Sequence, residues 1–236
     1  MNVEIRGIGW VTPFGIGSGR PGDTFRLGPG PLPALKSKLF LDVSHPRFGR
    51  FDSYAKAGFG AIALAMKSAG LDRWTDKRTI GLVASTRCGC HQADSAFFAT
   101  VASDGGDLAS PNLFAYTLPG TMLGEASIQF GLTGPAFVVD DSEEHLAGVY
   151  TALDLMQWGF CETAVAGWCD VGAEAPDDGL EQPCGAVFFV LTKGSETASC
   201  RWQGRELTWG TKRVADLVWL ARKVVTEKRD GGNRSE

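Results

Sequence analysis

The chain has 236 residues, of which 44% are hydrophobic and 21% are charged, and its formal net charge is -4 at pH 7. This composition is close to the average of globular proteins and excludes the collagen-like, disordered and membrane-embedded classes. No apolar run reaches the ~18 residues of a membrane span, and the N-terminus lacks the apolar core of a signal peptide. We therefore expect a cytoplasmic protein whose six cysteines stay reduced and serve mostly as small hydrophobic residues.

Strands and helices alternate through most of the chain. We expect strands at residues 3–10, 79–85, 136–140, 163–168 and 184–191, and helices at 52–69, 91–101, 121–130, 146–158 and 211–228. Asp52 or Ser53 caps the first helix, and Gly131 closes the third. This alternation is typical of an α/β layered fold, in which strands 136–140 and 163–168 fit a right-handed parallel βαβ unit.

Basic residues are unevenly distributed. Residues 1–87 contain 13 Lys or Arg, whereas residues 88–192 contain none and carry 15 Asp or Glu. A segment of this length without cations cannot grip a phosphate backbone, which argues against nucleic acid as a partner. We prefer to interpret it as a largely buried segment with its acidic residues in loops and at helix starts, rather than as an acidic docking face.

Two motifs resemble a cofactor site and a metal site, but their residues do not have the spacing that such sites require. Gly7 and Gly9 are followed by Thr12 instead of the third glycine of a dinucleotide fingerprint, and Pro13 opposes a helix start there. Cys88-x-Cys90-His91 resembles part of a zinc site, but a closed site needs four ligands and wider spacing. We therefore expect neither a cofactor nor a metal, and interpret these cysteines as buried thiols at a strand end.

The segment from Asn112 to Asp170 resembles the N-terminal half of the β-ketoacyl synthases, in the thiolase superfamily. The motif is Leu-Pro-Gly-Thr-Met-Leu-Gly-Glu-Ala-Ser-Ile-Gln-Phe-Gly-Leu-Thr-Gly-Pro over residues 118–135. Residues 6–15 resemble the family's opening strand and its Thr-Pro-x-Gly turn, and residues 164–170 resemble the strand after the nucleophile helix. Residues 185–191 are similar to the later apolar strand.

The resemblance implies a thiolase-like half: a mixed, partly parallel five-stranded sheet covered by helices, with an extra C-terminal amphipathic helix. It divides the chain into a ketosynthase-like domain over residues 1–192 and an extension over residues 193–236. The family's C-terminal half, which supplies two histidines and a lysine, has no counterpart after Leu191. We therefore interpret the chain as a stand-alone N-terminal half.

The nucleophile position departs from the family pattern. Counting from Gly134-Pro135 places it at Glu143, and the turn over residues 140–148 contains no cysteine. A carboxylate is stabilised at a helix N-terminus but is a poor nucleophile toward thioesters. Family members that lack this cysteine serve as malonyl decarboxylases or as chain-length partner subunits.

Two functions remain open besides an inactive remnant. The first is an accessory subunit without condensing activity in fatty-acid, polyketide or aryl-polyene synthesis. Its partners are a second copy of itself or a ketosynthase, together with acyl carrier protein, and it uses the surface of residues 121–140. The second is a small acyl-thioester hydrolase or transferase that uses Ser142, Glu143 and His145. Against this, ordinary capping by Ser142 with a carboxylate in the first helical turn is the interpretation that we prefer.

Overall fold

The computed structural model describes residues 1–102, 105–172 and 182–232, and for residues 229–232 it describes the backbone alone. The strands are β1 (Asn2–Thr12), β2 (Gly15–Gly17), β3 (Ile80–Thr86), β4 (Ala136–Asp140), β5 (Thr163–Asp170), β6 (Gly185–Lys193), β7 (Cys200–Gln203), β8 (Glu206–Trp209) and β9 (Lys212–Arg213). The helices are α1 (Ser53–Ser68), α2 (His91–Ala102), α3 (Pro111–Phe114), α4 (Thr121–Phe130), α5 (Ala147–Gln157) and α6 (Leu217–Gly232). The described strands form one sheet in the order β4-β3-β5-β6-β1-β7-β8-β9, with β2 paired to β1.

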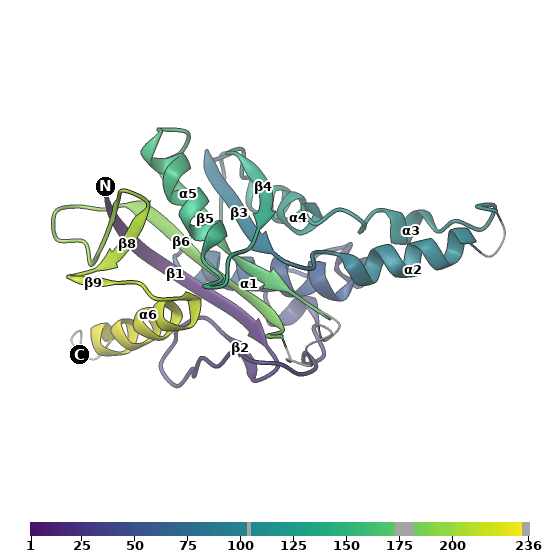
Figure 1. Cartoon of the computed structure of the whole chain (residues 1–236), viewed down its shortest axis with the longest axis horizontal. Helices are drawn as coiled ribbons and strands as arrows, with labels where there is room; N and C mark the ends of the chain where they lie inside the picture. Colours follow the sequence, from purple (N-terminus) through teal and green to yellow (C-terminus); the bar gives the residue numbers. More distant parts are fainter. Residues whose placement is uncertain (103–104, 173–181, 233–236) are drawn as a thin grey trace.

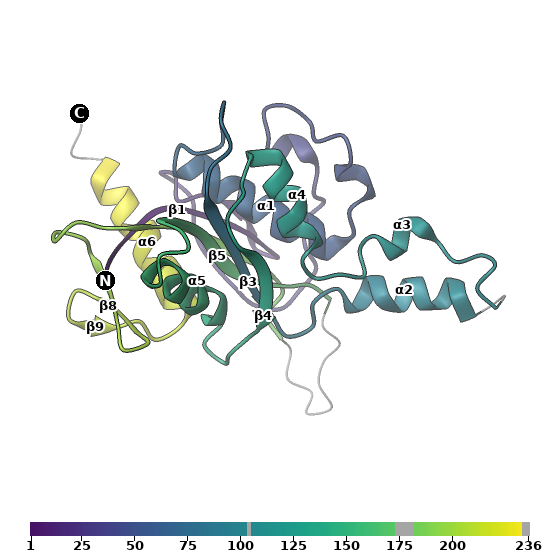
Figure 2. The same cartoon turned by 90° about the horizontal axis from the view of Figure 1, so that it is seen from above.

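Helices cover both faces of this sheet (Figures 1 and 2). The core on one face contains buried residues of α1 and α4, and the core on the other contains those of α5 and α6. The strand β6 serves both cores, because Phe188 packs on the α1 side and Phe189 on the α5 side. A strand with helices on both faces has no solvent-facing side, which explains why β3, β5 and β6 read as apolar runs without alternation.

The α/β fold and its central sheet confirm the sequence-based prediction. The five predicted strands form the contiguous part β4-β3-β5-β6-β1, and the helix at Thr121–Phe130 has the predicted bounds. Gly131 ends that helix in the left-handed conformation, at φ 63°, which favours glycine. β4 and β5 are both parallel to β3, which lies between them, so the predicted parallel arrangement of these two strands is confirmed.

The predicted helix at residues 211–228 is wrong over its first part. Lys212 and Arg213 form β9, paired with β8, and α6 begins only at Leu217. The Asp216 carboxylate accepts the backbone N–H of Trp219 at 2.7 Å, which satisfies a donor in the first helical turn. The sheet has nine strands in the described part of the chain, not the predicted five, because β2, β7, β8 and β9 were not predicted. β7 extends the sheet by pairing with β1. The division of the chain at residue 192 stays a prediction.

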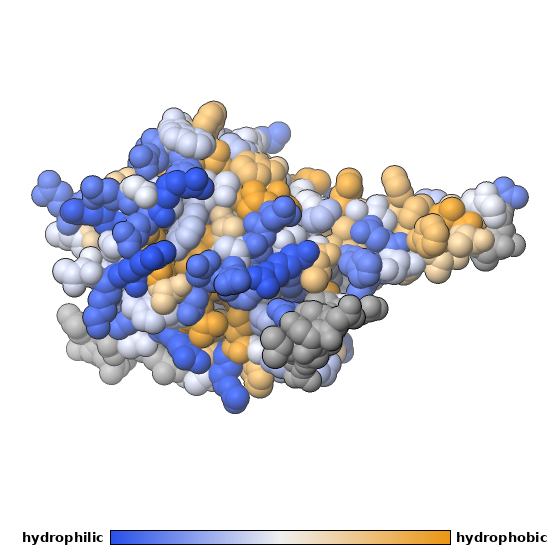
Figure 3. Space-filling view, viewed as in Figure 1, coloured by the Kyte–Doolittle hydropathy of each residue, from blue (hydrophilic) through white to orange (hydrophobic). Residues whose placement is uncertain are grey.

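A helical arm projects from the sheet (Figure 1). It consists of α2 and α3, and Ala93 is the one buried residue of α2. Large apolar side chains are exposed on the arm and the segment after it: Phe98 by 69%, Leu108 by 67%, Phe114 by 61% and Leu118 by 69%. Figure 3 shows this apolar surface along the arm. No helix in the described part of the chain is long and apolar enough to cross a membrane.

The start of α1 gives a first testable prediction. The Asp52 carboxylate accepts the backbone N–H of Ala55 at 2.8 Å, which confirms the predicted cap. Asp52→Ala should lower the free energy of unfolding by about 1 kcal/mol, because that donor loses its partner. Asp52→Asn should retain stability, since the amide oxygen still accepts the bond and burial, which raises the pKa of Asp52, no longer opposes a charge. Urea unfolding of the two variants checks this, and equal losses would contradict it.

Candidate functional site

The turn between β4 and α5 does not follow the predicted course. β4 ends at Asp140 and α5 begins at Ala147, with Leu146 as the N-cap residue and no capping hydrogen bond from a side chain. The interpretation of Ser142 as the cap is therefore wrong, because Ser142 lies well before the helix. Its carbonyl oxygen accepts the backbone N–H of His145 at 3.2 Å and closes a separate turn.

The first turn of α5 is held directly against the sheet. A Cβ atom on Gly148 would lie 2.4 Å from the carbonyl oxygen of Gly167 on β5 and 2.9 Å from the backbone nitrogen of Ser85 on β3. Such an approach requires glycine. The turn over residues 141–146 therefore lies at the carboxyl ends of three parallel strands, which is where open α/β sheets bind their ligands.

The three predicted site residues lie in this turn but do not form one cluster. Glu143 is exposed, and the hydroxyl oxygen of Ser142 is buried. Among the described residues, the polar contact of the His145 ring is with Asp141, not with Ser142 or Glu143. The sequence therefore located the correct turn, but the geometry gives no support to an acid/base pair of Glu143 and His145.

His145 is held in a fixed orientation. Its Nδ1 lies 2.5 Å from Oδ2 of Asp141, whose side chain is fully buried, while the His145 side chain is 16% exposed. The ring centroid lies 5.0 Å from that of Trp168. The backbone of His145 adopts φ 58°, which is uncommon for a residue other than glycine and is found most often at functional sites. The Asp141–His145 arrangement is the one that orients a histidine base in hydrolases.

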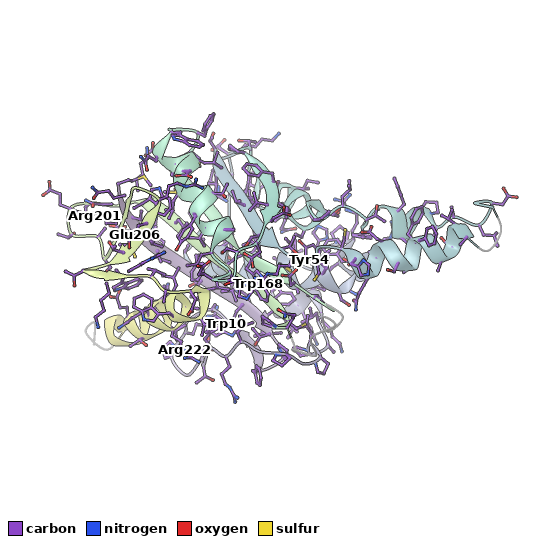
Figure 4. All side chains as sticks on the ribbon, viewed as in Figure 1. Trp10, Tyr54, Trp168, Arg201, Glu206 and Arg222 are labelled. Carbon is purple, nitrogen blue, oxygen red and sulfur yellow. The ribbon has the colours of Figure 1, made fainter. Side chains whose placement is uncertain are left out.

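His145 lines a small cavity with a volume of about 20 Å³. The other lining residues are Arg87, Cys88, Trp168, Asp170, Gln182 and Pro183. The space holds about one water molecule. Figure 4 shows Trp168 near the middle of the molecule, at a distance from Arg201 and Arg222 on the C-terminal extension.

Asp170 organises the wall of this cavity. It is 4% exposed, and its carboxylate accepts hydrogen bonds from four residues: from the Thr86 hydroxyl at 2.5 Å, the backbone N–H of Arg87 at 3.1 Å, the backbone N–H of Cys88 at 3.0 Å and the Trp168 indole at 3.0 Å. The sequence analysis assigned Asp170 no role. An acidic residue that ends an apolar buried strand was the available signal, because such a carboxylate needs donors.

The segment Cys88-x-Cys90-His91 runs from the turn after β3 to the first residue of α2. Cys90 is buried with its Sγ 3.6 Å from Oδ2 of Asp94, and His91 is exposed. Burial, followed by Asp94, raises the pKa of Cys90 to about 12. Within the described residues, no group of three or more His, Cys, Asp or Glu could hold a metal ion. Cys88 differs from Cys90, because it is half-buried and lines the cavity beside His145.

Solved ketosynthase structures share this fold. The ishigamide ketosynthase/chain length factor is similar over 84% of this chain and 63% of its own, with a TM-score of 0.64 and 16% identity. AntDE:AntF, a type II PKS acyl-carrier protein in complex with its ketosynthase bound to the hexaketide, is similar over 84% of this chain and 67% of its own, with a TM-score of 0.62 and 18% identity. The oxazolomycin ketosynthase domain OzmH KS7 of Streptomyces albus JA3453 is similar over 81% and 42%, with a TM-score of 0.55 and 14% identity.

These similarities define the class of the fold as thiolase-like, with the chain spanning 42% to 67% of the length of those proteins. Residues 36–175 match the family described as β-ketoacyl synthase, N-terminal domain. This match covers more than half of the chain, so the protein belongs to that family. No curated protein matches the sequence.

Proposed function

We propose that this protein is a ketosynthase-like partner subunit without condensing activity. It pairs with itself or with a ketosynthase during the assembly of fatty-acid, polyketide or aryl-polyene chains, and it contacts acyl carrier protein. Two of the similar structures hold a ketosynthase/chain length factor and a ketosynthase in complex with an acyl-carrier protein, which supports these two partners. The observation that carries the proposal is the apolar edge of the sheet at β4.

β4 is the terminal strand of the sheet, and in the described part of the chain it pairs with β3 alone. Its sequence is Ala-Phe-Val-Val-Asp, and Ala136 and Phe137 are both exposed, Phe137 by 38%. An apolar strand with an unpaired edge readily pairs with a strand of another chain. The neighbouring helix α4 adds Ile128, which is 64% exposed, so the apolar surface continues beyond the strand.

The lack of condensing activity is proposed from the chemistry of the turn before α5. Ketosynthases of the family that the sequence resembles attack the acyl thioester with a cysteine at this helix start. Residues 140–148 contain no cysteine, and Glu143 is exposed. A carboxylate is a weak nucleophile toward a thioester. We therefore propose that the turn does not form the acyl-enzyme of a condensing reaction.

The test is the mass in solution, measured by light scattering, of the chain alone and mixed with acyl carrier protein and a ketosynthase from the same assembly. We expect a homodimer of the chain, or a complex with the ketosynthase whose mass is the sum of both. A chain that remains monomeric under all of these conditions would contradict the proposal, because the β4 edge would then have no occupant.

A second candidate is a small acyl-thioester hydrolase or transferase that acts through His145, Ser142 and Glu143. The contact between His145 and the buried Asp141 favours it, because an orienting carboxylate is what a histidine base requires. The exposed position of Glu143 does not favour a role for that residue. This candidate does not conflict with pairing of two chains along β4. The exposed Phe137 lies near the start of β4, whereas the turn that carries His145 follows the end of that strand.

Under this second candidate, His145→Ala should lower the turnover of an acyl thioester at least about 100-fold, which is the typical contribution of a general base. Release of coenzyme A from an acyl-coenzyme A, separated by chromatography, measures the rate. His91→Ala is the matched control, because His91 is exposed on α2 and is not among the residues that line the cavity. Turnover that survives His145→Ala removes the candidate.

A further inference from the structure

The cavity beside Trp168 brings together a thiol and an imidazole from distant parts of the sequence. Cys88 comes from the turn after β3, His145 comes from the turn before α5, and both line the same space of about 20 Å³. That space holds about one water molecule, so the two residues border the same small volume. A thiol beside an oriented imidazole is the arrangement of an activated cysteine nucleophile.

We propose that Cys88 is a nucleophile that accepts an acyl group from a thioester, with His145 as its general base. This inference rests on the second candidate function and changes its residues, because Cys88 and Asp141 replace Ser142 and Glu143 beside His145. Asp141 is a positioning residue, since it touches His145 and not the cavity.

The geometry of His145 suits a base. Its Nδ1 is bound to Asp141, so Nε2 is the nitrogen that can accept a proton from a thiol. The Trp168 ring, 5.0 Å away between centroids, restricts the imidazole on one side. Among the described residues, no hydrogen bond engages Nε2 of His145.

The backbone around Cys88 is equally fixed. The Asp170 carboxylate accepts the N–H groups of both Arg87 and Cys88, and the Trp168 indole holds the same carboxylate from the other side. Burial, followed by the charge of Asp170, raises the pKa of Cys88. The thiol is thus protonated at neutral pH and becomes nucleophilic only when a base removes its proton. Arg87 is exposed and also lines the cavity, and its positive charge partly offsets the rise in the pKa of Cys88. A positive charge near the thiol can also stabilise the oxyanion that develops during the attack.

The proposed step balances without an external oxidant or reductant. The Cys88 thiol gives its proton to Nε2 of His145, and the sulfur attacks the carbonyl carbon of the acyl thioester. The carbon–sulfur bond of the donor breaks, and the departing thiolate takes the proton back from His145. The products are an acyl group on Cys88 and a free thiol. Water, or a second thiol, then removes the acyl group by the same route in reverse order.

The test uses the full chain and acetyl-coenzyme A as the acyl donor, with the acylated residue located by peptide mass mapping. We expect the acetyl group on Cys88 and its absence from Cys88→Ala. His145→Gln should slow acylation at least tenfold. Cys184 is the matched control: it is also half-buried, burial also raises its pKa, and it lines a separate cavity without a histidine. Cys184→Ala should therefore be acylated at Cys88 at the rate of the wild type.

The outcomes separate this inference from the function on which it rests. Acetylation of Cys88 that depends on His145, with no release of acetate, supports the nucleophile and removes the hydrolase. Hydrolysis that needs His145 but continues unchanged in Cys88→Ala keeps the candidate function and overturns the nucleophile. Equal acetylation of Cys88 and Cys184, or acetylation that His145→Gln does not slow, also overturns it, because both would reflect exposure alone.

Discussion

Asp170→Asn should lower the free energy of unfolding by roughly 3 kcal/mol, which is typical when one partner of a buried charged network is removed. Asp170 accepts bonds from the Thr86 hydroxyl, the Trp168 indole and two backbone N–H groups of the turn after β3. An amide replaces one acceptor oxygen with an NH₂ group. Both carboxylate oxygens accept hydrogen bonds. In either orientation of the amide, its NH₂ group would therefore face another donor, and a buried donor would be left unpaired.

Urea unfolding followed by circular dichroism measures this loss. Asp154→Asn is the matched control, because Asp154 also accepts an indole N–H, from Trp202 at 3.3 Å, but its side chain is 17% exposed. The control should lose less than about 1 kcal/mol, since the amide oxygen can keep the indole bond and the ion pair with the exposed Arg205, 3.9 Å away, contributes little. Equal effects of the two substitutions would show that the Asp170 network adds nothing beyond one indole contact.

The elements that the sequence located best are those with local signals at their ends. Asp52 caps α1 through its own carboxylate, and Gly131 ends α4 at a positive φ, so both boundaries depend on single residues. β3 and β5 were identified because burial on both faces makes them continuously apolar.

The prediction for the C-terminal extension was wrong because its short strands and its turn have only weak sequence patterns. The strands β7 and β8 have four residues each, and the turn between them has positive φ at Gly204 and at Arg205. Such a turn favours Asn-Gly, and an arginine in this conformation gives no pattern to recognise. The apolar residues that suggested a helix from position 211 instead begin at Val214, beyond β9.

The sequence predicted which turn carries the candidate site, but not which residues from other strands lie beside it. The resemblance pointed to the turn over residues 140–148, where His145 lies. The partners of the site come from β3 and β5, through the register that sets Ser85 opposite Trp168. The register between two strands cannot be predicted from a local sequence pattern. The sequence therefore did not predict that Cys88 and Asp170 lie close to His145.

Phe137→Glu should weaken pairing at the β4 edge at least about 100-fold, which corresponds to about 2.7 kcal/mol of binding free energy. If two chains, or this chain and a ketosynthase, pair along β4, the exposed Phe137 side chain becomes buried in the contact. A carboxylate there loses its water without gaining a partner, and a two-fold axis doubles this cost in a homodimer. The fold of the chain should survive, since Phe137 is 38% exposed.

The measurement is the mass by light scattering over a range of concentrations, for the chain alone and mixed with the ketosynthase. Phe14→Glu is the control, because Phe14 is 46% exposed but lies in the turn after β1, four strands away from β4 in the sheet. Loss of pairing in Phe137→Glu and not in Phe14→Glu assigns the interface to the β4 edge. Equal pairing of both variants would instead place the contact on another apolar surface, such as the arm of α2 and α3 with its exposed Phe98 and Phe114, and the edge strand would lose its proposed role.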